Sequence, residues 1–367
     1  MDTPRLDQPL FFQPLFVERV WGGNRLGELF DKSLPPNKVI GESWELSDRP
    51  NEQTAAAGGP FDGWTLRKLM ERAPEELLGE ALAARRPPFF PLLIKFIDAG
   101  QDLSVQVHPD DEDCRKLGLA DRGKTECWVV LHADPGSRIN RGLKPGVTRE
   151  AFEQALKAGR VAETLHYFPA RPGDVIAIPP GMVHAIGAGI VLAEIQQNSD
   201  LTFRVHDYDR KGLDGKPRAL HLPQSLAVIR FDGPAPGFFQ EDMSADRVAR
   251  ALDAGPGAAD ASRATPGAAG VSPAGRGRPE ISALLHGRYF DLRRLHLPPG
   301  QRWRFQAPAP AATVVMCLRG AGRLAGRALR GGDALLLPAA LSAAHAELAA
   351  DGAGPLELLL SSPTPEA

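Results

Sequence analysis

Short, apolar-rich runs of apolar and polar residues dominate the chain from residue 91 onward. They are PLLIKFID (91–98), LSVQVH (103–108), ECWVVLH (126–132), DVIAIPP (174–180), IVLAEIQQ (190–197) and LTFRVHDY (201–208). Such runs, separated by Gly, Pro and Asp turns, are typical of β-strands, and LSVQVH also alternates with the period of two residues of a strand that buries one face. Many short strands at close spacing favour a sandwich or a closed jelly roll, so we expect a mainly β protein.

Two segments have helical spacing instead. TLRKLMERAPEELLGEALA (65–83) places two apolar groups at helical spacing, Leu66, Leu69 and Met70 and then Leu77, Leu78 and Leu82, and Pro74 suits the first turn of a second helix. We therefore predict a small helical insertion at about residues 60–90. TREAFEQALKAG (148–159) is predicted to be a further helix, with Thr148 as its N-cap.

A change in composition divides the chain. Residues 232–279 are rich in Gly, Ala and Pro and poor in large apolar residues, which is typical of a linker or a surface excursion. Strand-like runs resume after it, for example in ATVVMCLRG (312–320). We therefore predict a β barrel with the helical insertion over residues 1–231 and a second β barrel over residues 280–367.

Charge and hydropathy exclude several classes of partner. The 43 Lys and Arg and 45 Asp and Glu residues give a net charge of −2, so we expect neither nucleic acid nor a membrane as a partner. No apolar run approaches the roughly 18 residues of a membrane span, and the N-terminal segment lacks the pattern of a signal peptide. An odd count of three cysteines without CxxC spacing is a poor disulfide framework, which favours the reducing cytoplasm.

Two strand-like segments place polar side chains on one face. Ser104, Gln106 and His108 alternate with apolar residues and therefore point the same way. Lys124 and Glu126 likewise share a face. Either segment alone is also typical of an exposed sheet face. The acids at 110–113 are expected to form an exposed turn at the strand end.

A third segment indicates what these faces do. PGDVIAIPPGMVHAIG (172–187) has Gly173 before a strand, a rigid Pro-Pro-Gly turn, and then His184. This spacing resembles the second half of the cupin signature. Cupins are jelly-roll barrels whose paired motifs supply metal ligands, so the resemblance implies that the chain is two cupin-type jelly-roll barrels.

The first cupin motif is unusual, because Gln106 replaces its first histidine and Glu126 follows late. QVHPD followed by GKTECW resembles the type I phosphomannose isomerases of the cupin superfamily. Further motifs that resemble this family are WGG (21–23), GESWELSD (41–48), LLIKFIDAGQDLSVQVHPDD (92–111) and EIQQNSDLTFRVHDYDR (194–210). The resemblance covers about residues 10–230. It implies a metal-dependent isomerase that interconverts mannose 6-phosphate and fructose 6-phosphate.

The resemblance also implies a metal site. Gln106, His108, Glu126 and His184 offer an amide oxygen, two imidazoles and a carboxylate. Such a set suits one Zn²⁺ per chain with positions open for water or substrate. The ligand types alone would also accept Mn²⁺, Fe²⁺, Co²⁺ or Ni²⁺, so zinc rests on the resemblance.

Other positions match the family's proposed active-site groups. These catalytic candidates are Lys124, Glu194 and Arg204. Glu194 follows an apolar run, and partial desolvation would raise its basicity, so it is a candidate proton carrier. Arg204 could hold an enediolate or a phosphate oxygen. The substrate-binding candidates are Ser104, Lys95 and Lys216; Lys216 is equally compatible with an ordinary solvated lysine.

The second predicted barrel lacks the metal motif. After Gly332 and Pro338, Ala340 replaces the motif glycine and Ala343 stands where the histidine would be. We predict a structural barrel without metal. Two alternatives to the isomerase are a non-catalytic sugar-phosphate sensor and a cupin oxygenase, which Gln106 disfavours. The metal loaded in the cell, the proton-transfer base, the range of sugars, the downstream pathway and the oligomeric state stay open.

Overall fold

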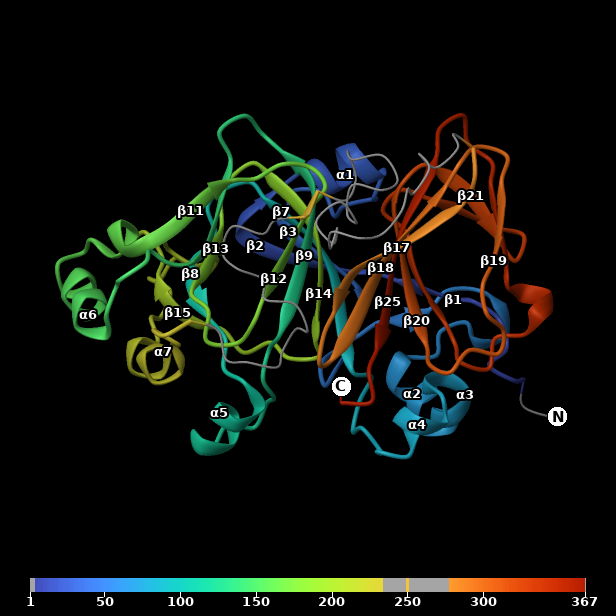
Figure 1. Cartoon of the computed structure of the whole chain (residues 1–367), viewed down its shortest axis with the longest axis horizontal. Helices are drawn as coiled ribbons and strands as arrows, with labels where there is room; N and C mark the ends of the chain where they lie inside the picture. Colours follow the sequence, from blue (N-terminus) through green and yellow to red (C-terminus); the bar gives the residue numbers. More distant parts are fainter. Residues whose placement is uncertain (1–3, 234–248, 251–276, 367) are drawn as a thin grey trace, which may run out of the picture.

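The computed structural model describes residues 4–233, 249–250 and 277–366, so most of the predicted linker (232–279) lies outside the described residues. The protein is mainly β, as predicted, and its strands form several antiparallel sheets. Figure 1 shows two groups of strands, the green one from the first part of the chain and the orange one from the last part. The division at residues 231 and 280 stays a prediction.

Two sheets make up the first half. The strands of its seven-stranded sheet are, in spatial order, β16 (Ala249–Arg250), β12 (Asp174–Ile178), β9 (Glu126–Ala133), β14 (Ile190–Gln197), β7 (Leu92–Ala99), β3 (Ile40–Leu46) and β2 (Leu15–Gly23). The strands of its five-stranded sheet are β11 (Leu165–Pro169), β10 (Arg138–Leu143), β13 (His184–Ile186), β8 (Val105–Val107) and β15 (Phe203–His206). A small ribbon pairs β4 (Asp48–Arg49) with β5 (Glu52–Gln53).

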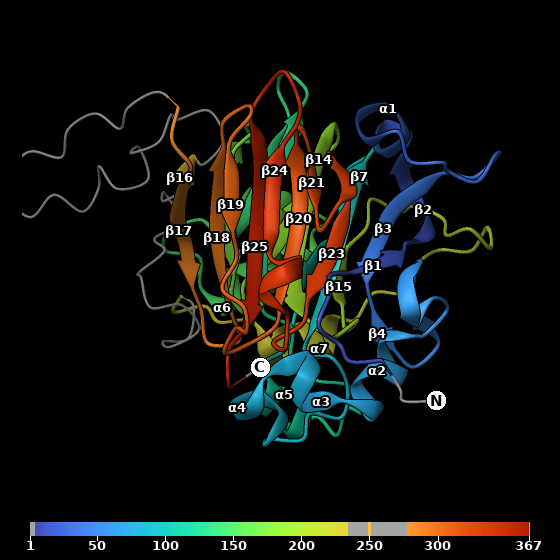
Figure 2. The same cartoon turned by 90° about the vertical axis from the view of Figure 1, so that its right-hand side faces the viewer.

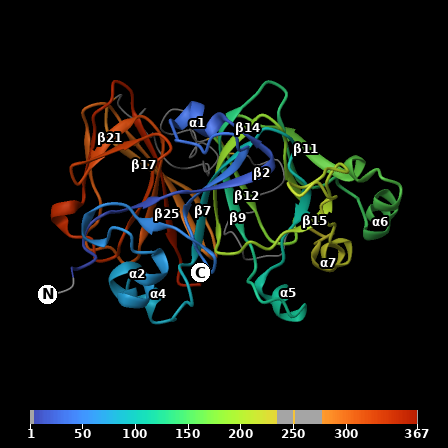
Figure 3. The same cartoon turned by 180° about the vertical axis from the view of Figure 1, so that it is seen from behind.

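The second half also consists of two sheets. The larger of them includes strands from the beginning of the chain. The order of the larger sheet is β17 (Glu280–His286), β18 (Phe290–Leu297), β25 (Leu356–Pro363), β20 (Thr313–Arg319), β23 (Ala334–Leu337), β1 (Leu10–Gln13) and β6 (Ala55–Ala56). The smaller sheet contains β19 (Arg302–Arg304), β24 (Glu347–Ala350), β21 (Ala321–Leu324) and β22 (Arg327–Arg330). Because Leu10 pairs with Leu336, the N-terminal segment contributes to both halves, as Figure 3 shows from behind.

The four larger sheets stack in layers with apolar clusters between them. One cluster lies between the two seven-stranded sheets and joins Phe96 and Val129 of the first half to Met316 and Leu336 of the second. A second cluster fills the second half between its own two sheets, whose strands face the viewer in Figure 2. A third, which includes Trp128, lies inside the first half. Each half therefore has its own interior, and a shared core joins them.

The described part of the chain contains seven α-helices. Their bounds are α1 (Arg25–Phe30), α2 (Leu66–Arg72), α3 (Pro74–Leu78), α4 (Glu80–Ala83), α5 (Asp111–Lys116), α6 (Arg149–Lys157) and α7 (Leu222–Val228). The predicted helical insertion is confirmed by α2 to α4, with Pro74 in the first turn of α3. Thr148 caps α6 as predicted, since its side chain accepts a hydrogen bond from the backbone of Ala151. Among these helices none has the length and apolar character needed to span a membrane.

One local prediction was wrong. The acids at 110–113 do not form an exposed turn, because Asp110 caps α5 and Asp111 to Asp113 form its first turn. Asp110 and Asp113 exchange side-chain and backbone hydrogen bonds as a capping box, and Arg230 pairs with Asp113 at 2.7 Å. Negative charge in the first turn of a helix also matches the helix dipole. The acids therefore anchor the segment that follows His108.

Candidate metal centre and cleft

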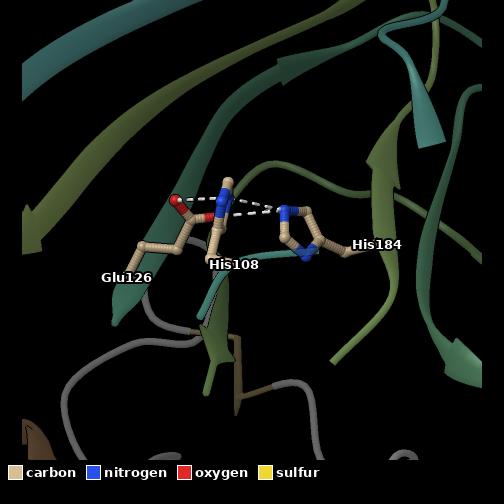
Figure 4. Close-up of side chains that lie close together, drawn as sticks. All are labelled: His108, Glu126 and His184. Atoms are coloured by element: carbon tan, nitrogen blue, oxygen red, sulfur yellow. Dashed lines mark hydrogen bonds and ion pairs between the residues drawn. The ribbon is translucent and has the colours of Figure 1, made fainter. Parts of the chain in front are cut away.

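Three buried side chains meet inside the first half: His108 just after β8, Glu126 at the start of β9 and His184 at the start of β13 (Figure 4). The two Nε2 atoms of the histidines are 3.1 Å apart. Glu126 Oε2 lies 3.6 Å from His108 Nε2, and Glu126 Oε1 lies 3.3 Å from His184 Nε2. Three of the four predicted metal ligands therefore converge on one point.

The local fold explains this convergence. The turn before β13 places Gly181 at a φ of +78°, a conformation that glycine adopts without strain. Its N–H donates a 2.8 Å hydrogen bond to the carbonyl of His108, which joins the turn to the end of β8. In the sheet, His184 is in register with Gln106. Gln106 thus lies next to His184 and two residues before His108, and its role as fourth ligand stays a prediction.

Backbone contacts fix the tautomers of both histidines. His108 Nδ1 lies 2.7 Å from the carbonyl oxygen of Leu201, and His184 Nδ1 lies 2.9 Å from that of Met182. A carbonyl only accepts hydrogen bonds, so each Nδ1 carries the proton and each Nε2 presents a lone pair. The two lone pairs face one another and the carboxylate of Glu126.

Burial keeps this group in the protonation state that a metal requires. Burial, followed by the charge of Lys124, lowers the pKa of His108 to about 3. Burial also lowers the pKa of His184. For Glu126 burial acts in the opposite direction, but the charge of Lys124 is the largest influence against it, and the pKa is held well below its usual range. Two neutral imidazoles and one carboxylate are therefore available at neutral pH.

The donor atoms fit a small divalent ion. Bonds of 2.0–2.2 Å in a tetrahedron separate neighbouring ligand atoms by about 3.3–3.6 Å, close to the 3.1–3.6 Å between these atoms. Both oxygens of Glu126 are buried. Oε2 forms an ion pair with Lys124 Nζ at 2.9 Å, whereas Oε1 accepts no hydrogen bond from the described residues. A buried carboxylate oxygen without a hydrogen-bond partner is costly, and a cation beside it would remove that cost. The group therefore has the ligands and spacing of a metal site.

A cleft of about 560 Å³ opens beside this group. Six of the residues predicted from the sequence line it: Lys95, Ser104, Gln106, Lys124, Glu194 and Arg204. Lys124 connects the cleft to the metal centre through its ion pair with Glu126. Alternation within strands predicted the shared faces of Ser104, Gln106 and Lys124, whereas Glu194 and Arg204 were predicted from the family resemblance.

Glu194 is the buried carboxyl group of this cleft. Burial, and then the charge of Glu126, raise its pKa, while Lys124 and Lys95 act against the rise. Its Oε1 lies 3.4 Å from Lys95 Nζ, and its Oε2 accepts a 2.9 Å hydrogen bond from the indole N–H of Trp128. A carboxylate with a raised pKa is a stronger base than an exposed one.

The lining of the cleft also includes two arginines from the segment that follows Glu194. They are Arg204 and Arg218, and burial and the charge of Arg204 together lower the pKa of Arg218 to about 10. Arg204 Nε is buried, and its N–H donates no hydrogen bond to the described residues. Lys216 is exposed and is not among the cleft-lining residues, whereas Arg218, two positions later, is.

Sequence reasoning missed two residues that line the cleft, Glu42 and Arg218, and one buried behind it, Trp128. Glu42 lies within the quoted motif GESWELSD and pairs with both Arg19 (3.0 Å) and Lys95 (3.7 Å). Trp128 shares a strand face with Glu126, so the alternation that assigned Lys124 and Glu126 to one face also applies to it. Arg218 lies in a loop, where no periodicity indicates the direction of a side chain.

The second half contains a larger cavity, of about 1380 Å³, among Trp303, Phe305 and Leu360. Volume alone does not identify the site, because the only group of potential metal ligands found in the described residues is that of His108, Glu126 and His184. His345 lies near the Oγ of Ser342 and the carbonyl of Asp7, both at 3.1 Å. A metal-free second half stays a prediction.

The fold and site thus define a mainly β protein with a metal-site-like His–Glu–His group beside a charged cleft. A family model for the catalytic domain of type I phosphomannose isomerase matches residues 10–125. Mannose-6-phosphate isomerase ManA of Bacillus subtilis (strain 168) is 42% identical over 222 residues, which are 60% of this chain and 68% of that protein. Mannose-6-phosphate isomerase of Streptococcus mutans is 40% identical over 228 residues, which are 62% of this chain and 70% of that protein.

Solved structures of phosphomannose isomerases have a similar fold over nearly the whole chain. The crystal structure of mannose 6-phosphate isomerase from Bacillus subtilis matches with a TM-score of 0.77 at 26% identity, covering 97% of this chain and 99% of that chain. A variant of phosphomannose isomerase from Salmonella typhimurium shares the fold, with a TM-score of 0.68 at 16% identity, covering 97% of this chain and 100% of that chain. The chain belongs to the type I phosphomannose isomerase family.

Proposed function

We propose that this protein is a mannose-6-phosphate isomerase, which interconverts mannose 6-phosphate and fructose 6-phosphate, and that it uses one Zn²⁺ per chain. The observation that carries the proposal is that two neutral, lone-pair-bearing imidazoles and the buried carboxylate of Glu126 meet beside a charged cleft. Similarity to curated isomerases from two bacteria supports the same activity. Zn²⁺ suits the nitrogen and oxygen ligands of His108, Glu126 and His184, with Gln106 as a fourth.

The reaction moves one proton between two carbons of the open-chain sugar. A base takes the proton from C2 of the aldose, the resulting enediol forms, and the proton is returned to C1, while O2 loses a proton and O1 gains one. No net oxidant or reductant is needed. A bound divalent ion would stabilise negative charge on the sugar oxygens.

Glu194 is the proposed proton carrier. It lies within the cleft, its pKa is raised by burial and Glu126, and its Oε1 accepts no hydrogen bond from the described residues. In the proposed mechanism Oε1 takes the C2 proton and delivers it to C1. Lys124, whose ammonium group is buried beside Glu126, is placed to donate a hydrogen bond to a sugar oxygen.

The positive side chains are the proposed receptors for the phosphate and for the charge of the enediolate. Arg204 and Arg218 would bind phosphate oxygens, since a guanidinium group donates two parallel hydrogen bonds to such an anion. Ser104 is buried on the cleft wall and would contact the phosphate or the sugar. Lys95 lies between Glu42 and Glu194, so we assign it to orienting these carboxylates as well as to binding substrate. The exposed position of Lys216 makes it the weakest of the predicted contacts.

We also propose that each half is a cupin-type jelly-roll barrel, the first spanning 1–231 and the second 280–367, with β1 and β6 extending the larger sheet of the second. This proposal is supported by the pairing of a larger and a smaller antiparallel sheet in each half. A cytoplasmic location stays a prediction from the sequence.

A turnover assay tests the function. Purified protein is incubated with mannose 6-phosphate, and fructose 6-phosphate is measured before chelation, after chelation and after Zn²⁺ is restored. We expect turnover that chelation removes and Zn²⁺ restores. His184→Ala should abolish turnover and bound metal, whereas His286→Ala, in the second half, should change neither. Binding of mannose 6-phosphate without any turnover would instead support the sugar-phosphate sensor.

A further inference from the structure

Glu194 lies in a row of side chains that crosses the seven-stranded sheet of the first half. On one side it is in register with Trp128 of β9, and on the other side with Lys95 of β7. Residues in register on adjacent antiparallel strands point to the same face. Glu194 is therefore flanked by an indole and an ammonium group, both buried.

The two oxygens of Glu194 have different surroundings. Oε2 accepts the 2.9 Å hydrogen bond from Trp128 Nε1. Oε1 is buried, accepts no hydrogen bond from the described residues and lies 3.4 Å from Lys95 Nζ. The indole thus fixes which oxygen stays available to a molecule in the cleft.

Trp128 also contacts the metal centre. Its ring meets that of His184 edge-on, with 5.4 Å between centroids and 73° between planes. One rigid side chain therefore touches both the proposed proton carrier and a proposed metal ligand. A tryptophan has two rotatable side-chain bonds, and this one is fully buried, so it can hold that separation constant.

A second indole repeats the pattern on the other side of Lys95. Trp44 Nε1 donates a 2.6 Å hydrogen bond to Glu42 Oε2, and the same oxygen lies 3.7 Å from Lys95 Nζ. Lys95 thus stands between two carboxylates, each held by an indole N–H. In the described residues only Trp128 combines this bond with a contact to the His–Glu–His group.

We propose that Trp128 is a positioning residue for the isomerisation: its N–H holds Glu194 Oε2 so that Oε1 faces the reacting carbons. This inference rests on the proposed function of Glu194. The alternative is that Trp128 only fills the apolar interior, to which it also belongs. The two roles differ in one atom, because packing needs the ring and positioning needs the N–H.

Trp128→Phe separates these roles, since it keeps an aromatic ring beside His184 and removes the N–H. We expect kcat to fall at least tenfold, because a misdirected catalytic group loses much of its effect. Exchange of the C2 hydrogen with solvent deuterium should fall by the same factor. KM for mannose 6-phosphate and metal per chain should stay within twofold of the unsubstituted protein.

Trp64→Phe is the matched control. Trp64 lies against α2, under Lys68 and Arg72, away from the cleft, and the same change of side chain there should leave kcat unchanged. If Trp128→Phe matches Trp64→Phe in kcat and exchange, or loses metal in parallel with kcat, the positioning role is wrong. An unsubstituted protein without turnover would contradict the proposed function instead.

A double-mutant cycle tests the link to Glu194 directly. In the Glu194→Gln background, Trp128→Phe should cause no further loss of exchange, because residues that act through one another are not additive. A second full loss would mean that Trp128 acts elsewhere and would overturn the proposal.

If Trp128→Phe does not fold, the hydrogen bond can still be tested by a measurement on protein that keeps Trp128. Among the five indole N–H signals in a ¹H–¹⁵N NMR spectrum, that of Trp128 should move on Glu194→Gln while that of Trp64 stays. An unmoved Trp128 signal would exclude the hydrogen bond on which the proposal depends.

Discussion

Glu42 is a cleft residue whose ionised carboxyl group stabilises the folded protein. Burial raises the pKa of its carboxyl group, but Lys95 and Arg19 outweigh burial and bring the pKa down to about 2. The folded state thus binds the proton less readily than the unfolded state, whose carboxyl titrates near its ordinary value of 4.5. The stabilisation is present above that ordinary pKa and is lost as the pH falls towards 2.

We predict that Glu42→Gln destabilises the metal-free protein by roughly 3 kcal/mol at pH 7, the free energy that corresponds to this difference in pKa. The difference from the unsubstituted protein should shrink as the pH falls below 4.5. Urea unfolding at pH 7, 5 and 3.5 measures it, with the exposed Glu75→Gln as a control that should stay close to neutral throughout. A loss that does not depend on pH would contradict the assignment.

Glu194→Gln tests the proton carrier. The amide preserves the shape of the side chain but cannot take a proton, so exchange of the C2 hydrogen with solvent should fall by at least about a hundredfold, in the usual range for a lost general base. Metal per chain, measured by elemental analysis, should stay the same. Exchange at the normal rate would exclude Glu194 from this role.

At this scale the strand alternation predicted much of the cleft. It placed Ser104 and Gln106 on one face and Lys124 and Glu126 on another, and all four residues line the cleft or the metal centre. Arg218 escaped prediction because its direction is set by a loop rather than by a repeat. Lys216 was chosen for its charge, and charge alone does not place a side chain.

Among the elements, the turn between β12 and β13 positions two candidate metal ligands, because it leads into His184 and bonds to the backbone of His108. Gly181 has a left-handed backbone, and a Cβ there would meet Arg230 Cγ and lie 2.8 Å from the carbonyl oxygen of Val228. Gly146 has a similar φ of +80°, but a Cβ there would meet nothing within 4 Å. An alanine at Gly146 would therefore introduce backbone strain alone, whereas an alanine at Gly181 would introduce both backbone strain and steric crowding.

We predict that Gly181→Ala destabilises the protein by about 2–4 kcal/mol and weakens metal binding at least tenfold, because the turn must move and its bond to His108 is lost. Gly146→Ala should cost about 1 kcal/mol and leave metal binding unchanged. Thermal unfolding and metal titration of both variants measure these effects. Equal metal affinity in the two variants would show that the turn does not position the ligands.

The elements themselves were largely predictable where one physical signal dominated. Short apolar runs between turn residues located β7, β9, β12 and β14, and Thr148 gave the start of α6. Helix α5 was missed because its acids look like a solvated turn until their capping bonds and Arg230 are known. Such tertiary partners are not encoded in local periodicity.

For the whole molecule, the apolar layer between the two seven-stranded sheets is the main contact that holds the two halves together. It joins residues far apart in sequence, such as Phe96 with Leu336, and the pairing of β1 with β23 adds a second link between the halves. The sequence indicated two groups of strands but not this layer, because alternation shows that a face is buried and not which face covers it.

We predict that the halves unfold together. Leu336→Ala, which opens space in the shared layer, should destabilise the protein by about 2–5 kcal/mol. Hydrogen exchange followed by mass spectrometry should then show β14 and β25 losing protection to the same extent. Loss confined to β25 would mean that the halves are independent.

The proposed function depends most on the coupling of one metal ion at His108, Glu126 and His184 to isomerisation. Its most direct test is to titrate Zn²⁺ into the metal-free protein while fructose 6-phosphate formation is measured. Activity should rise in proportion to added metal and level off at one ion per chain, and His184→Ala should show neither binding nor activity. Full activity without metal, or metal bound in His184→Ala as in the unsubstituted protein, would contradict the proposed function.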